Sequence, residues 1–165
     1  MTIGVEKIIS GGQTGADQGA LDAALACDFP HGGAIAAGRK TEAGPLPEQY
    51  RLEELSSSHY PDRTAKNVRD GDGTVIVSHG ELSGGSALTR DLAERMGKPW
   101  LHLDCAATPF EEALESLRSW CSTHRIRVLN VAGPRASSDP LIYTTTRQLI
   151  SALLHDRQRG PCGLF

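Results

Sequence analysis

The chain has 165 residues and a formal net charge of −3 at pH 7. This length is close to the most common size of one domain, and no low-complexity or Pro/Ser-rich linker interrupts it, so we expect a single domain over residues 1–165. A net negative charge argues against a general nucleic-acid-binding protein, which normally carries a basic face. No apolar run approaches the roughly 20 residues of a membrane helix, and the first residues lack the basic and apolar parts of a signal peptide. We therefore expect a cytoplasmic protein with no nucleic-acid and no membrane partner.

Cysteine and histidine are too widely spaced to indicate a metal site. The chain has no CxxC pair, and no cysteine has a histidine neighbour at the spacing of metal ligands. We expect no bound metal and reduced, structural cysteines. The cysteines are Cys27, Cys105, Cys121 and Cys162, and the histidines are His31, His59, His79, His102, His124 and His155.

The first half of the chain begins with one strand, one glycine-rich loop and one helix. Residues 5–9 are a short apolar run, residues 10–15 (SGGQTG) form the loop, and residues 17–26 have apolar side chains at helical spacing. Residues 27–72 are less regular, because glycines and prolines interrupt any long element, and one short strand is expected at residues 34–36. A connection of this length is usually functional or mobile.

The second half repeats the strand and helix pattern three times. A second glycine-containing loop, residues 83–86, separates the first of these strands from its helix. Alternation of strands and helices indicates an α/β domain with a parallel sheet and right-handed crossovers. The expected strands are residues 73–78, 100–103 and 127–131, and the expected helices are residues 87–96, 109–121 and 140–156.

The two glycine loops are the main indication of ligand binding. Glycine lets a ligand approach the backbone closely, and the N-terminus of the following helix favours phosphate. For the first loop, the alternative is a tight turn that needs glycine only for its own conformation. That loop matches neither GxGxxG nor GxxxxGK[ST], which disfavours an ordinary dinucleotide or ATPase site. Two such loops together favour a phosphate cleft at the carboxyl ends of neighbouring strands.

Basic and amide side chains near the strand ends extend this candidate site. Their arrangement suggests a local positive pocket that fits a small anion bearing phosphate, although a solvated helix at residues 63–69 and an ordinary turn at residues 133–135 remain alternatives. The predicted ligand-binding residues are Gly11, Gly12, Gln13, Thr14, Gly15, Arg39, Lys40, Arg63, Asn67, Arg69, Asp72, Gly84, Gly85, Ser86, Thr89, Asn130, Gly133 and Arg135.

Catalytic residues are not evident. The sequence has no GxSxG elbow and no carboxylate pair at a defensible spacing. Asp17 and Asp91, each in the first turns of a predicted helix, are the only weak candidates. A favourable charge at the helix N-terminus explains both better than acid/base catalysis.

Five segments of the chain resemble the molybdenum cofactor carrier proteins, a branch of the Rossmann-like superfamily that also includes the LOG-type phosphoribohydrolases. The segments are residues 10–19 (SGGQTGADQG), residues 38–44 (GRKTEAG) with Pro47 and Tyr50, residues 63–74, residues 84–86 with Thr89, and residues 129–135 (LNVAGPR).

This resemblance implies a three-layer Rossmann-like fold, with a mostly parallel sheet, helices on both faces and the ligand over the carboxyl ends of the strands. It also implies a homo-oligomer, molybdenum cofactor as cargo and molybdoenzymes as partners. The LOG-type signature PGGxGTxxE is incomplete at residues 83–91, where Asp91 takes the place of the glutamate.

Three functions follow from these observations. The first is a carrier or sensor that binds molybdenum cofactor or a nucleotide without catalysis. The second is a hydrolase that cleaves the N-glycosidic bond of a nucleoside monophosphate. The third is a structural partner protein with a vestigial pocket. The incomplete signature favours the first over the second, and the glycine, arginine and asparagine residues at strand ends disfavour the third.

Overall fold

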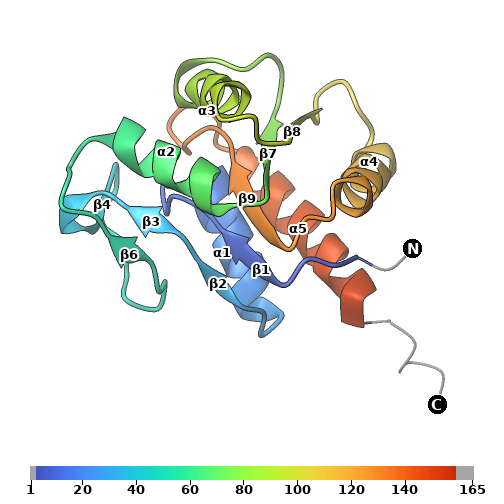
Figure 1. The fold of residues 1–165 in the computed structure, drawn as a ribbon, viewed down its shortest axis with the longest axis horizontal. Coiled ribbons are helices and arrows are strands. Elements are labelled where there is room, and N and C mark those ends of the chain that lie inside the picture. Colours follow the sequence, from blue (N-terminus) through green and yellow to red (C-terminus); the bar gives the residue numbers. More distant parts are fainter. Residues whose placement is uncertain (1–2, 159–165) are drawn as a thin grey trace.

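A computed structural model describes residues 3–158 of the chain (Figure 1). Cys162, predicted to be a reduced structural thiol, lies outside the described residues. In chain order the elements are β1 (Lys7–Ile9), α1 (Ala16–Ala26), β2 (His31–Gly32), β3 (Ala34–Ile35), the 3₁₀ helix η1 (Ala37–Arg39), β4 (Lys40–Thr41), β5 (Gly44–Pro45), β6 (Glu53–Glu54), α2 (Tyr60–Asp70), β7 (Gly73–Ser78), α3 (Gly84–Arg95), β8 (Trp100–Asp104), α4 (Phe110–Thr123), β9 (Val128–Ala132) and α5 (Ile142–Gln158).

The central sheet has five parallel strands in the order β2-β1-β9-β7-β8. If β7, β8, β9, β1 and β2 are numbered as strands one to five, the order read from the β8 edge is 2-1-3-4-5. This is the order of a flavodoxin-like doubly wound sheet. In that order the direction in which successive strands are added to the sheet reverses between the first and third strands, here β7 and β9. A ligand is expected in the crevice at the carboxyl ends of these two strands.

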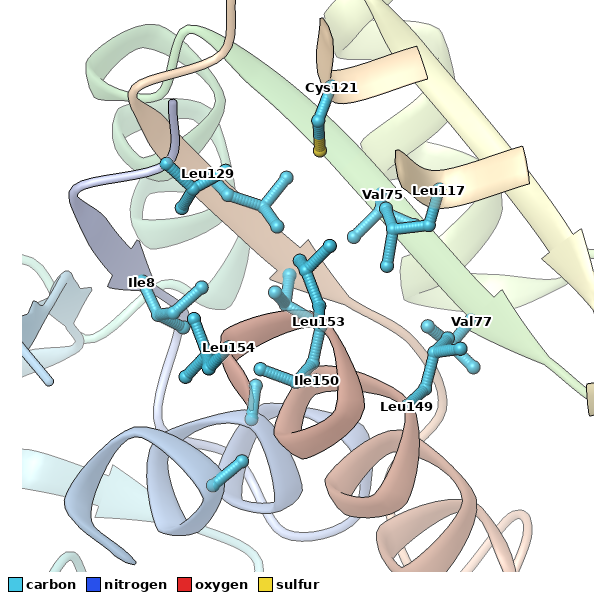
Figure 2. Close-up of a cluster of buried hydrophobic side chains, with 14 of the residues drawn as sticks. Ile8, Val75, Val77, Leu117, Cys121, Leu129, Leu149, Ile150, Leu153 and Leu154 are labelled. Atoms are coloured by element: carbon cyan, nitrogen blue, oxygen red, sulfur yellow. The ribbon is translucent and has the colours of Figure 1, made fainter. Parts of the chain in front are cut away.

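Helices cover both faces of the sheet, which confirms the predicted three-layer α/β fold (Figure 1). The main core lies on one face, between the strands and α1, α4 and α5. Figure 2 shows side chains such as Val77, Leu117 and Leu153 meeting in this layer. Burial raises the pKa of the Cys121 thiol in the same core to about 12, which keeps it protonated near neutral pH. On the other face α2 packs beside α3 over β7 and β9.

The structure differs from the sequence-based expectation at several boundaries. The helix expected at residues 87–96 begins at Gly84, so the second glycine loop is the first turn of α3. The expected strand at residues 34–36 is β3, but it pairs with β6 in a separate two-stranded sheet. The short strand β2, which was not expected, forms one edge of the main sheet. The last helix begins at Ile142, two residues after Pro140.

No helix within residues 3–158 is both long enough and apolar enough to cross a bilayer. The longest, α5, has 17 residues. Its sequence, IYTTTRQLISALLHDRQ, mixes apolar residues with charged ones.

Candidate functional site

A cavity of about 460 Å³ lies at the carboxyl ends of β7 and β9, where the order of the strands reverses. Its walls come from the loop after β1, the first half of α2, the start of α3 and the loop after β9. This volume is in the range of sites that hold a nucleotide-sized molecule. Of the residues predicted to bind ligand, those lining it are Gly11, Gln13, Arg63, Asn67, Gly84, Gly85, Ser86, Thr89, Asn130, Gly133 and Arg135, and the weak catalytic candidate Asp17 lines it as well.

The first turn of α3 forms one wall of the cavity. Ser83 precedes the helix, and its side chain makes no capping hydrogen bond. A Cβ atom built on Gly84 or Gly85 would meet nothing within 4 Å. The N–H groups of Ser86 and Ala87 donate to the carbonyl of Ser83 at 3.1 and 3.3 Å, so those of Gly84 and Gly85 are the donors of this turn that a ligand could use. The N–H groups of a helix N-terminus and its positive dipole end attract anions. This wall can therefore receive a phosphate group.

The first glycine loop, in contrast, uses its backbone N–H groups within the protein. Gly12 N donates to Ser10 Oγ at 3.4 Å, and Gln13 N donates to Asp17 Oδ2 at 3.2 Å. Thr14 N donates to Gln13 Oε1 at 3.1 Å. At the start of α1, residue 16 donates its N–H to the carbonyl of residue 134 at 3.1 Å. These four donors already have partners, so this loop is less suited to phosphate than the first turn of α3.

The glycines of this loop are required by the packing of the protein itself. Gly15 has φ of +83°, and a Cβ there would lie 2.4 Å from the carbonyl oxygen of Pro134. Gly12 has φ of +75°, and a Cβ there would lie 3.0 Å from the side chains of Ile35 and Leu46, which belong to a second, smaller hydrophobic cluster with Leu21 and Tyr50. The turn interpretation considered for this loop therefore explains both glycines without a ligand.

Arg63 and Asp17 form a buried ion pair beside the cavity. Nη1 of Arg63 lies 3.1 Å from Asp17 Oδ2, and the two side chains are 12% and 10% exposed. The same Nη1 donates to the carbonyl of Gly11 at 3.0 Å, and a Cβ on Gly11 would lie 2.0 Å from it. Burial raises the pKa of Asp17 above its ordinary value, although Arg63 and the backbone of Gln13 lower it. The charge of Arg63 is thus matched inside the protein before any ligand binds.

Two asparagines of the cavity wall differ in how many of their amide atoms have hydrogen-bond partners within the protein. Asn67 bonds the backbone of Ala34 through both ends of its amide, at 2.8 Å and 3.0 Å, and so ties α2 to β3. Asn130 donates to Thr74 Oγ1 at 3.1 Å, but its Oδ1 is buried without a hydrogen-bond partner. A buried polar atom without a partner is unusual in native proteins. Asn130 therefore retains hydrogen-bonding capacity next to the cavity.

Sequence reasoning missed several residues that line the cavity. His79 follows β7 directly, and its Nδ1 lies 2.6 Å from Asp139 Oδ2 while its Nε2 lies 3.1 Å from Thr145 Oγ1. Glu81 comes two residues later and is exposed. Their position immediately after a fully buried strand was the signal that could have found them. Others that the sequence analysis did not single out are Tyr60, Ser78 and Ser138.

The charged groups of the lining do not form the positive pocket that was expected. Three carboxylates, Asp17, Glu81 and Asp139, face two guanidinium groups, Arg63 and Arg135. Because Arg63 is paired with Asp17, Arg135 at the rim is the cation of this lining that lies closest to solvent. Attraction of an anion then depends mainly on Arg135 and the first turn of α3.

Other predicted site residues lie outside the cavity lining. Arg39 donates to the carbonyls of residues 46, 47 and 50, at 2.8–3.0 Å, and so folds the irregular segment. Asp72 accepts hydrogen bonds from the N–H groups of Arg127 and Val128 at 3.0 and 2.8 Å, which aligns the start of β9. The remaining such residues are Gly12, Thr14, Gly15, Lys40, Arg69 and Asp91.

Thr14 and Lys40 have identifiable contacts near the cavity. The hydroxyl of Thr14 donates to Glu42, which also accepts from the N–H and hydroxyl of Ser137 at 3.1 and 2.6 Å. The hydroxyls of Ser137 and Thr14 lower the pKa of Glu42, so this carboxylate stays ionised and holds the loop that carries Arg135. Lys40 Nζ lies 4.7 Å from the ring centre of Tyr60, a residue of the cavity wall.

Comparison with known proteins agrees with this fold. Residues 8–154 match the model of the circularly permutated YpsA SLOG family. The chain is also similar to a protein from Syntrophus aciditrophicus SB, named "Putative molybdenum carrier protein", whose crystal structure was determined at 1.45 Å resolution. The two share 50% sequence identity with a TM-score of 0.92, over 93% of this chain and 98% of the other. No curated protein matches the chain.

Proposed function

Because the chain belongs to the circularly permutated YpsA SLOG family, we propose that it is a carrier or sensor that binds a small phosphate-bearing heterocyclic ligand, either molybdenum cofactor or a nucleotide. The observation that carries this proposal is the uncapped first turn of α3, which opens with Gly84 and Gly85 into a cavity of about 460 Å³. The ligand's phosphate would bind this turn, and its heterocycle would occupy the remaining space. The name of the similar protein from Syntrophus aciditrophicus SB supports molybdenum cofactor as the cargo.

The direct test of this function is to identify the ligand. Protein purified under native conditions is denatured, and the small molecules that are released are analysed by mass spectrometry. A pterin phosphate or a nucleotide supports the proposal, and its identity separates the two ligand classes. A ligand without phosphate would contradict the proposal.

Arginine at the rim provides a test with a matched control. Arg135→Ala is expected to weaken the binding of a nucleoside monophosphate about tenfold, because one charge-assisted hydrogen bond contributes roughly 1.5 kcal/mol. Arg39→Ala removes the same charge at a position where the guanidinium bonds only backbone carbonyls, so it should lower the Tm and leave the affinity unchanged. Isothermal titration calorimetry measures both variants. Equal losses of affinity would show that Arg135 has no specific contact.

We expect the protein to bind nucleoside monophosphates without releasing free base. Cleavage of the N-glycosidic bond needs a carboxylate to stabilise the developing sugar cation, and the expected glutamate is replaced by Asp91. Asp91 is one methylene shorter, bonds Arg90 at 3.2 Å and does not line the cavity. Chromatography after prolonged incubation should show no base above background. Base that disappears in Glu81→Gln, which removes the exposed carboxylate of the cavity, would make the protein a hydrolase.

A homo-oligomer is part of the same proposal, on the basis of the resemblance and of the tendency of soluble proteins to form symmetric oligomers. Light scattering at micromolar concentration should give a mass that is a multiple of 17.6 kDa. A particle of 17.6 kDa would refute this expectation. Molybdoenzymes are the proposed recipients if the ligand is molybdenum cofactor.

A further inference from the structure

The loop after β1 has the construction of an anion site, but its occupant is a side chain of the protein. The carboxylate of Asp17 accepts hydrogen bonds from the Gln13 N–H and from Arg63 Nη1, at 3.2 and 3.1 Å. It also lies in the first turn of α1, where the helix dipole favours negative charge. A backbone N–H, a guanidinium and a helix N-terminus are donors that proteins use for phosphate.

Asp17 therefore occupies the second of two anion sites in one cavity. The first turn of α3 lies open, as described above, whereas the Gln13 N–H and Arg63 Nη1 beside the loop after β1 are already used by Asp17. A second phosphate group near this loop would find Arg63 neutralised and would be repelled by a buried carboxylate. A ligand with one phosphate avoids this repulsion.

We infer that Asp17 determines specificity by filling the second anion site, so that the cavity accepts a monophosphate and disfavours a diphosphate. This inference rests on the proposed function, since it assumes that the first phosphate binds the start of α3. It also excludes a binding mode in which a pyrophosphate spans both glycine-rich segments. Removal of the carboxylate should open the loop site to a second phosphate group, with Arg63 as its counterion.

The test compares inorganic phosphate with pyrophosphate in the full chain. Asp17→Ala should raise the ratio of pyrophosphate affinity to phosphate affinity about tenfold or more over that of the wild type, measured by calorimetry. Both anions should also raise the Tm of this variant, because they return a charge to Arg63. Asp17→Asn keeps the side-chain volume without the charge, so it should raise the affinity ratio less than Asp17→Ala. It replaces Asp17→Ala as the test variant if that variant does not fold.

Asp22→Ala is the matched control. Asp22 lies on the same helix and accepts hydrogen bonds from Tyr50, at 2.6 Å, and from Tyr143, and it does not line the cavity. This variant should leave the ratio unchanged. An unchanged ratio in the folded Asp17 variants overturns the inference while the proposed function stands. Anion binding in the Asp17 variants but not in the wild type would support the filled site and contradict the phosphate site on α3.

Discussion

Replacing Gly85 by leucine is expected to weaken the binding of a nucleoside monophosphate about a hundredfold, equivalent to ~2.7 kcal/mol. Gly85 lies in the first turn of α3, and a Cβ there meets nothing within 4 Å, so the leucine side chain will occupy open space beside the cavity. The leucine side chain will cover the backbone N–H groups that we propose as hydrogen-bond donors to the phosphate. The fold should be retained, because the added Cβ meets no atom within 4 Å and leucine has a higher helix propensity than glycine.

Calorimetry and the Tm, measured together, separate the loss of the site from the loss of the fold. Gly85→Ala should bind more tightly than Gly85→Leu, since it adds a single methyl group. Gly4→Leu is the matched control, because Gly4 also has open space around its Cβ but lies outside the cavity lining. Wild-type affinity in Gly85→Leu would place the phosphate elsewhere. A large fall in its Tm would show that Gly85 is needed for folding.

Replacing Arg63 by methionine is expected to lower the free energy of unfolding by about 3–5 kcal/mol near pH 7.5, because it leaves the carboxylate of Asp17 buried without its cation. The loss should be smaller near pH 4. Burial already raises the pKa of Asp17, and removing Arg63 takes away the interaction that most opposes this rise. The folded variant therefore binds a proton more tightly than the unfolded chain, and its stability falls as the pH rises from the ordinary aspartate pKa through the raised one.

Urea denaturation at several pH values measures this effect. Arg118→Met provides the control, because Arg118 pairs with Asp156 on the surface and the two side chains are 27% and 32% exposed. Its loss should be about 0–1 kcal/mol, as is usual for exposed ion pairs. A loss in Arg63→Met that does not depend on pH would show that packing, and not the charge of Asp17, sets the cost. The double variant Arg63→Met with Asp17→Asn should recover part of the stability.

Short-range patterns in the sequence predicted the longer strands and the helices α1, α3, α4 and α5, but not the short strands β2, β4, β5 and β6. Residues 73–78 (GTVIVS) centre on the apolar run Val75–Val77, and they form β7, which is buried along its whole length. Alternation of such runs with helical spacing predicts a parallel α/β sheet, because the side-chain period and the turn residues are encoded within a few positions. The glycine-containing segments at residues 10–15 and 83–86 also indicated which edge of the sheet carries the cavity.

The partners of individual side chains could be decided only by the tertiary structure. Asp17 fills the loop after β1 because Arg63, distant by 46 positions in sequence, reaches it from α2. Arg39 has the residue type of an anion ligand, but the fold places its guanidinium on three backbone carbonyls. His79 follows β7, and its ring contacts Asp139 and Thr145 from the distant C-terminal part of the chain. The sequence by itself therefore determined the repeating strands and helices, the fold class and the edge of the sheet where the cavity lies. Which charges remain open to a ligand depends on contacts between distant segments, and these form only when the helices pack on the sheet.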